Sequence, residues 1–206
     1  MGCHIFDPVF YALQLDPPLS VEASYSMFVR EAMNWDKQFN TESYPRASIV
    51  RYKFGARGDL PPVKLTWYDG GLMPERPEEL EEVRQMGNAY GGVLFIGDKG
   101  KILCNSHGAG SMRIIPETKM QEYERPARKY PRSVGHHREF AEACKGGKPT
   151  GSNFDYAGPL SEMVLLGNIA ILTGKKLLWD SEAMKITNVP EANEYLHREY
   201  RKGWSL

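Results

Sequence analysis

The chain has 206 residues, a length that one large sheet-based domain can accommodate, and its 26 Lys and Arg residues balance 26 Asp and Glu residues. Because the formal net charge is zero, no bulk positive field attracts nucleic acid or an anionic membrane, and neither is expected as a partner. The longest apolar runs, residues 92–96 and 163–172, are far shorter than the roughly 20 residues needed to cross a bilayer. The composition therefore predicts a soluble protein.

Cysteine usage bears on the compartment and on metal binding. Cys3, Cys104 and Cys144 are odd in number and lack Cys-x-x-Cys spacing, which argues against a disulfide framework and a zinc knuckle. Cys104 and His107 form a Cys-x-x-His pair without two further ligands, so we expect no metal site. No signal peptide is visible at the start. We therefore expect a cytoplasmic protein in a reducing compartment, with an export signal on an upstream part as the open alternative.

The first part of the chain combines one short helix with several strands. Residues 7–15 are apolar and precede Pro17 and Pro18, which predicts a brief helix ended by the prolines. Apolar and polar residues then alternate with period two, the pattern of half-buried strands, and glycines and prolines between these stretches indicate turns. The expected strands cover residues 20–29, 47–54 and 63–70, of which the last two are expected to pair antiparallel.

An acidic segment and a hairpin follow in the middle of the chain. Residues 73–85 are rich in glutamate and also contain proline, which predicts an exposed loop with at most a short helix. Two apolar runs flank residues 97–100, whose glycines permit positive φ angles, so residues 91–106 are predicted to form a hairpin. The same segment nearly matches a phosphate loop, but Asp98 stands where that motif requires lysine.

The last third of the chain has mainly helical patterns. The expected elements are helices over residues 135–149, 155–176 and 190–204, with a short strand or extended segment within residues 177–188. The second helix is the longest and largely apolar, so it is expected to be buried on most sides, capped by Asp155 or Ser152 and ended near Gly174. The third helix is amphipathic and charged, and it is expected to begin at Pro190.

These elements predict one α+β domain over residues 1–206, with a mainly antiparallel open sheet and helices packed on one face. Such a sheet leaves its other face open. We expect Tyr52, Phe54 and Trp67 to lie on the open face as an apolar patch that another copy of the chain covers. The expected assembly is a homodimer or a dimer of dimers formed through the open sheet face.

The sequence lacks the pattern of a dinucleotide-binding half. That fold needs the spacing Gly-x-Gly-x-x-Gly at a turn from a strand into a helix. The closest candidate has glycines at positions 108 and 110, but Arg113 stands where the third glycine belongs. We therefore expect this chain alone to bind no nicotinamide cofactor.

Four segments carry a resemblance to a known family. They are GCHIFDP at residues 2–8, GVLFIGDKGKI at residues 92–102, the long block 137–180, and EYLHREYRKGW at residues 194–204. Together they resemble the C-terminal domain of the glucose-fructose oxidoreductase, inositol dehydrogenase and MocA family. The resemblance implies an N-terminal Rossmann domain, which this chain lacks, and a C-terminal domain whose open sheet mediates association. It also implies NAD or NADP in the full-length enzyme and a sugar, polyol or related hydroxyl compound as substrate.

The resemblance also implies a catalytic role for His4. The family has an Asp-x-x-x-His motif whose histidine lies near the substrate carbon that exchanges hydride with the nicotinamide, and His4 matches that histidine. The aspartate would fall immediately before Met1, so the chain is expected to be a fragment cut through the motif. Independently of any family, histidine is suited to proton transfer near neutral pH. From the residues alone, a histidine near a chain start is also typical of a solvated or capping residue.

Three further residues are candidates for binding the substrate. Asp7 lies three positions after His4, so on a helix the two share a face and could hydrogen-bond, with Asp7 as an orienting partner or a helix cap. His136 and His137 are adjacent and point about 100° apart on a helix, which prevents joint chelation. We expect them at a helix start bordering the pocket. Five aromatic residues could either stack on a sugar ring or belong to the core: Tyr130, Tyr156, Tyr195, Tyr200 and Trp204.

Two functions of different classes follow from these candidates. The first is the substrate-lining and oligomerising C-terminal part of an NAD(P)-dependent oxidoreductase that acts on a sugar, polyol or related hydroxyl compound and is inactive in isolation. The second is a non-catalytic domain that stands alone and binds a partner protein or a carbohydrate through its exposed sheet. The first function requires a Rossmann domain encoded upstream or supplied in trans, and the second does not.

Overall fold

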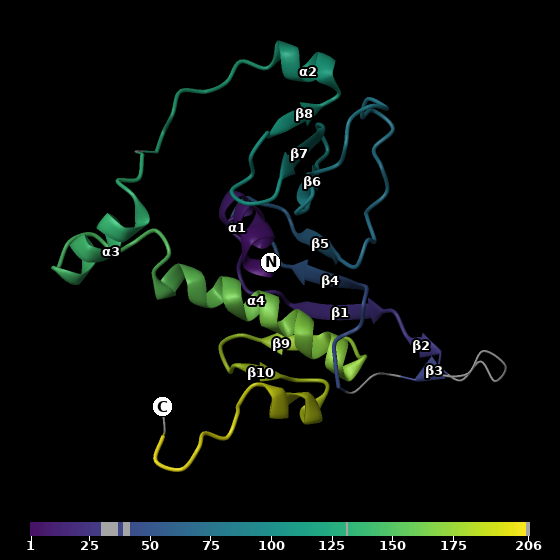
Figure 1. Ribbon diagram of the computed structural model, residues 1–206, viewed down its shortest axis with the longest axis vertical. Coiled ribbons are helices and arrows are strands. Elements are labelled where there is room, and N and C mark those ends of the chain that lie inside the picture. Colours follow the sequence, from purple (N-terminus) through teal and green to yellow (C-terminus); the bar gives the residue numbers. More distant parts are fainter. Residues whose placement is uncertain (30–36, 39–41, 131, 205–206) are drawn as a thin grey trace. The chain divides into compact units, whose positions relative to one another are not determined.

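The computed structural model describes residues 1–29, 37–38, 42–130 and 132–204 (Figure 1). They fall into two compact units, a first unit of Met1–Ala12 with Arg76–Ser161 and a second unit of Leu13–Glu75 with Glu162–Leu206. Helices occur beside open sheets whose described strand pairs are all antiparallel, so the predicted α+β class is confirmed. The expectation of a single domain over the whole chain stays a prediction.

A five-stranded antiparallel sheet forms the centre of the second unit. Its strands, in spatial order, are β10 (Lys185–Ile186), β9 (Leu177–Asp180), β1 (Ser20–Tyr25), β4 (Ser48–Phe54) and β5 (Val63–Tyr68). The period-two patterns therefore predicted the strands and the pairing of β4 with β5 correctly. A separate pair joins β2 (Phe28–Val29) to β3 (Lys37–Gln38), so the strand expected over residues 20–29 is divided in two.

The long helix α4 (Phe154–Thr173) packs on this sheet with the part that belongs to the second unit. A Cβ atom added at Gly167 would lie 2.1 Å from the hydroxyl of Tyr52 and 3.5 Å from a methyl group of Val50, so only glycine permits this approach. Trp179 of β9 donates a 2.6 Å hydrogen bond to Glu162 of the helix. Among the described residues, only α4 is long and apolar enough to cross a membrane, and these contacts are those of a core helix.

The face of the sheet toward α4 holds all three residues expected on the open face, so that expectation is wrong. Trp67 lies directly opposite Val50, whose side chain faces α4. Tyr52 and Phe54 are 3% and 2% exposed. Alternation puts them on the same side as Val50, and β1 places buried Val21 opposite Tyr52. Trp67 is half-buried and donates its indole hydrogen to Asp69.

The other face of the sheet is polar. Its exposed side chains include Glu22, Arg51, Lys53 and Lys64, and Glu22 lies directly opposite Arg51. An apolar patch therefore does not explain association through this face, and the homo-oligomer stays a prediction.

The ends of α4 differ in part from the expectation. Asn153 caps the helix, because its side-chain oxygen accepts the backbone N–H of Tyr156 at 3.3 Å, in place of Asp155 or Ser152. The end near Gly174 is confirmed, since this glycine has a φ of 62°. Leu165 is exposed, so the helix is less fully buried than predicted.

The first unit contains a helix at the chain start and a three-stranded sheet. The helix α1 (Gly2–Leu13) begins earlier than expected and buries Phe6 and Val9. The predicted hairpin is confirmed, and a third strand extends it into the order β6 (Gly92–Ile96), β7 (Lys101–Asn105), β8 (Arg113–Ile115). Leu80 packs with Leu103 of β7 and Ile115 of β8 in the hydrophobic core cluster of this sheet. The first unit also contains the helices α2 (Glu117–Glu122) and α3 (His136–Cys144).

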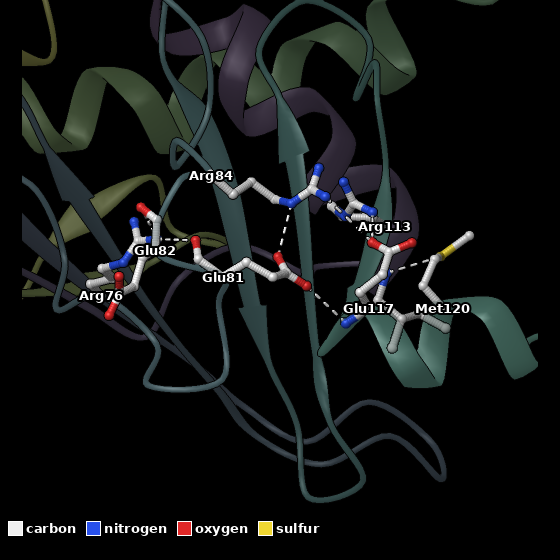
Figure 2. Close-up of polar contacts among 8 residues, drawn as sticks. Arg76, Glu81, Glu82, Arg84, Arg113, Glu117 and Met120 are labelled. Carbon is white, nitrogen blue, oxygen red and sulfur yellow. Dashed lines mark hydrogen bonds and ion pairs between the residues drawn. The ribbon is translucent and has the colours of Figure 1, made fainter.

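An ion-pair network ties the acidic segment to the end of this sheet (Figure 2). Glu81 accepts hydrogen bonds from Arg84 at 2.8 Å and from the backbone N–H of Glu117 at 3.1 Å. Glu117, on α2, also pairs with Arg113 of β8. The segment 73–85 consists of turns and irregular chain, as predicted, and these bonds give it a fixed attachment.

The helix expected over residues 190–204 is wrong in length and type. Only a 3₁₀ helix, η1 (Pro190–Tyr195), forms there. The side chain of Asn193 accepts the backbone N–H of Ile186 and donates to the Ile186 carbonyl, at 2.8 and 2.9 Å. These bonds attach the turn to β10, and the following residues 196–204 form no helix.

Candidate functional site

The first unit contains a cavity of about 420 Å³ that is broadly open to solvent. This volume lies within the range of small-molecule sites, roughly 300–1,000 Å³. Its wall is formed by the start of α1, the turn after β7, and the chain around the start of α4. The polar side chains that line it are those of His4, Asp7, His107, Ser152, Tyr156 and Ser161.

Helix α1 brings His4 and Asp7 to the cavity together. Residues three apart on an α-helix lie on one face, so the expectation that these two share a face is met. Phe6 and Val9 are buried and anchor the helix. The hydrogen-bond partner of Asp7 is Tyr156, whose hydroxyl donates to the carboxylate at 2.5 Å.

From the sequence, Tyr156 was only a candidate for stacking on a sugar ring, and its hydrogen bond to Asp7 was not predicted. Burial, and next the hydrogen bond to Asp7, raise the pKa of its hydroxyl. The group therefore stays protonated at neutral pH and serves as a donor. The edge of its ring meets Phe10, with ring centroids 5.4 Å apart. Tyr156 is thus fixed both by its ring and by its hydroxyl.

A second imidazole lies against His4. The rings of His4 and His107 stack with centroids 4.9 Å apart and planes inclined by 26°. His107 is positioned by a contact between its Nδ1 and the hydroxyl of Ser106 at 2.9 Å and by the edge of Tyr90 at 5.7 Å. Cys104, three positions before His107, is buried in β7 and does not line the cavity.

The turn that carries His107 has an uncommon backbone conformation. His107, Gly108 and Ala109 have successive φ angles of 59°, 82° and 56°. For residues other than glycine, the left-handed region costs roughly 1–2 kcal/mol. Such conformations cluster at functional sites, where the surrounding structure maintains them. Here this conformation places His107 and Gly108 in one wall of the cavity.

The other two predicted site residues lie elsewhere. His136 and His137 occupy the first two positions of α3, are exposed, and have ring centroids only 4.0 Å apart. Neither lines the cavity. The structure therefore brings His4 and Asp7 together and leaves His136 and His137 outside the lining.

The described residues do not form a cradle for a nicotinamide nucleotide at the glycine turn. Gly108 and Gly110 join β7 to β8, two antiparallel strands, so the turn leads into a strand and not into a helix N-terminus. Within the described chain, no group of three His, Cys, Asp or Glu side chains is arranged to hold a metal ion.

Comparison of the sequence with protein-family models and with curated proteins finds no match.

Proposed function

We propose that this chain is the substrate-lining, oligomerising part of an NAD(P)-dependent oxidoreductase acting on a sugar, a polyol or a related hydroxyl compound. One observation carries the proposal: the exposed imidazole of His4 and the Tyr156–Asp7 pair line one cavity. Oxidation of a hydroxyl group needs a base for its proton, and imidazole is suited to that role near neutral pH. The nicotinamide would be held by a separate Rossmann domain.

Each polar group of the cavity has a role in this proposal. His4 accepts the proton of the reacting hydroxyl, while the stacked ring of His107 restricts rotation of the His4 side chain. Tyr156 donates to Asp7 and therefore presents oxygen lone pairs that accept a bond from another substrate hydroxyl. Ser152 and Ser161 add two more hydroxyl groups to the wall, which suits a substrate with several hydroxyls.

The proposal includes the cytoplasm as compartment and a second copy of the chain as partner. Free thiols at exposed Cys3 and Cys144 are compatible with a reducing compartment. Association through the open sheet face would use polar contacts such as those of Glu22 and Arg51, because that face is charged.

Ligand-observed NMR on this chain tests the proposal, with myo-inositol, glucose and sorbitol as probes. We expect at least one probe to bind, and His4→Ala and Tyr156→Phe to weaken it about tenfold, the effect of losing one hydrogen bond to the ligand. Tyr195→Phe changes an exposed tyrosine of the second unit and should leave binding unchanged.

Two results would contradict the proposal. One is the absence of binding for all three probes. The other is unchanged binding in both cavity variants, which would favour a non-catalytic domain that associates or binds carbohydrate elsewhere.

A further inference from the structure

Three tyrosine rings form a row that leads outward from the cavity in the first unit. Tyr156 lines the cavity, Tyr11 meets it edge-on with centroids 6.2 Å apart, and Tyr130 meets Tyr11 in the same manner at 6.0 Å. We refer to Tyr156, Tyr11 and Tyr130 together as the tyrosine row. Its inner end therefore belongs to the site already described, and its outer end lies beyond the cavity lining.

The outer rings are not part of the core. Tyr11 and Tyr130 are 55% and 72% exposed, far more than packing aromatics normally are. Tyr11 lies on α1 at the seventh position after His4 and the fourth after Asp7, so all three fall on one stripe of the helix. The same helical face thus presents the proposed base, the orienting carboxylate and an open aromatic ring.

The edge-to-face contact between Tyr11 and Tyr130 positions the two outer side chains against each other. A hydrogen bond with the Tyr130 side chain raises the pKa of Tyr11. Side chains that are ordered before binding lose less entropy when a ligand arrives. The row is therefore a prepared surface with aromatic faces and hydroxyl groups.

We propose that the tyrosine row binds the second sugar ring of a glycoside whose first ring occupies the cavity. A pyranose ring has an apolar face of C–H bonds and a rim of hydroxyls, and tyrosine offers the complementary combination of an aromatic face and a hydroxyl. The inference rests on the proposed function and narrows its substrate class to disaccharides or longer glycosides.

Calorimetric titration of this chain with methyl glucoside, maltose and cellobiose tests the inference. We expect a disaccharide to bind about five-fold more tightly than methyl glucoside, the scale of one aromatic contact. Tyr11→Ala and Tyr130→Ala should remove this advantage and leave the affinity for methyl glucoside unchanged. Tyr130→Phe retains the ring and should retain most of the advantage.

A control at an exposed tyrosine outside the tyrosine row tests whether the effects are specific to the row. Tyr195 is 54% exposed and lies in the second unit, so Tyr195→Ala should change neither affinity. Equal affinities of the wild type for methyl glucoside and both disaccharides would overturn the inference and leave the proposed function standing. Binding of no sugar at all would overturn both. Circular dichroism of each variant shows that it remains folded.

Discussion

The hydroxyl of Tyr156 donates a 2.5 Å hydrogen bond to the carboxylate of Asp7, a residue 149 positions earlier in the chain. The bond joins the first turns of α4 to α1 within the first unit. It gives Asp7 a tyrosine as its hydrogen-bond partner, whereas the spacing on α1 suggested His4 as that partner. It also places a protonated phenol beside His4 in the wall of the cavity.

Replacing Tyr156 by phenylalanine should lower the free energy of unfolding. The change keeps the ring contact with Phe10 and removes only the bond to the Asp7 carboxylate, so we expect a loss of about 1.5–3 kcal/mol, the usual range for a hydrogen bond to a charged group. Urea unfolding followed by circular dichroism measures it. The control is Tyr195→Phe, at an exposed position, which should be neutral. Equal stability of Tyr156→Phe and the wild type would show that the bond contributes nothing net.

Gly167→Ala should destabilise the second unit by about 1–3 kcal/mol, the usual result of overpacking a core. The new Cβ would lie 2.1 Å from the hydroxyl of buried Tyr52. Gly158→Ala on the same helix meets nothing within 4 Å and should stabilise the protein by about 0.5–1 kcal/mol, since alanine favours helix over glycine. Adding Tyr52→Phe to Gly167→Ala should recover part of the loss. Similar effects of the two glycine variants in urea unfolding would contradict the close packing.

Local patterns predicted much of the second unit. Strands β4 and β5 followed from alternation, and the end of α4 followed from Gly174. The side of the sheet that faces the helix was misjudged, although exposed Arg51 and Lys53 mark the other side. The helix predicted over residues 190–204 does not form. Its amphipathic pattern does not show that the Asn193 side chain hydrogen-bonds to Ile186 of β10, which fixes the 3₁₀ turn in place.

The candidate site was predictable only where its residues are close in sequence. His4 and Asp7 share one helix, so their spacing placed them on one face. His107 and Tyr156 reach the cavity through the fold of the first unit, from about a hundred residues or more away. Their positions depend on a left-handed turn and on a long-range hydrogen bond, and neither has a local signature.

Alkaline pH should destabilise the protein through two tyrosines. Burial raises the pKa of Tyr52, and burial with the bond to Asp7 raises that of Tyr156. In the unfolded state, the tyrosine phenol has its ordinary pKa of about 10. Above about pH 10 the unfolded state releases both tyrosine protons while the folded state keeps them, and this difference favours unfolding. The free energy of unfolding is therefore unaffected by these tyrosines below about pH 10 and falls as the pH rises further.

Urea-unfolding midpoints measured between about pH 8 and pH 11 test this dependence. The wild-type midpoint should fall above about pH 10. The fall should be smaller in Tyr52→Phe, which retains the buried ring and has no ionisable hydroxyl. Parallel declines in the wild type and Tyr52→Phe would rule out Tyr52 as a source of the dependence.

The turn between β7 and β8 determines the affinity expected for nicotinamide nucleotides. Gly108 and Gly110 lie in this turn, but β7 pairs antiparallel with β6 and β8, so the turn enters a strand. A pyrophosphate is normally held by the N–H groups of a helix N-terminus. We therefore expect this chain alone to bind NAD(H) and NADP(H) with dissociation constants of about 1 mM or weaker and to show no dehydrogenase turnover. Calorimetric titration with each nucleotide measures the affinity, with the sugar and polyol probes as the positive control. Micromolar binding would mean that other residues of this chain hold the nucleotide, and it would remove the reason for assigning the cofactor to a separate domain.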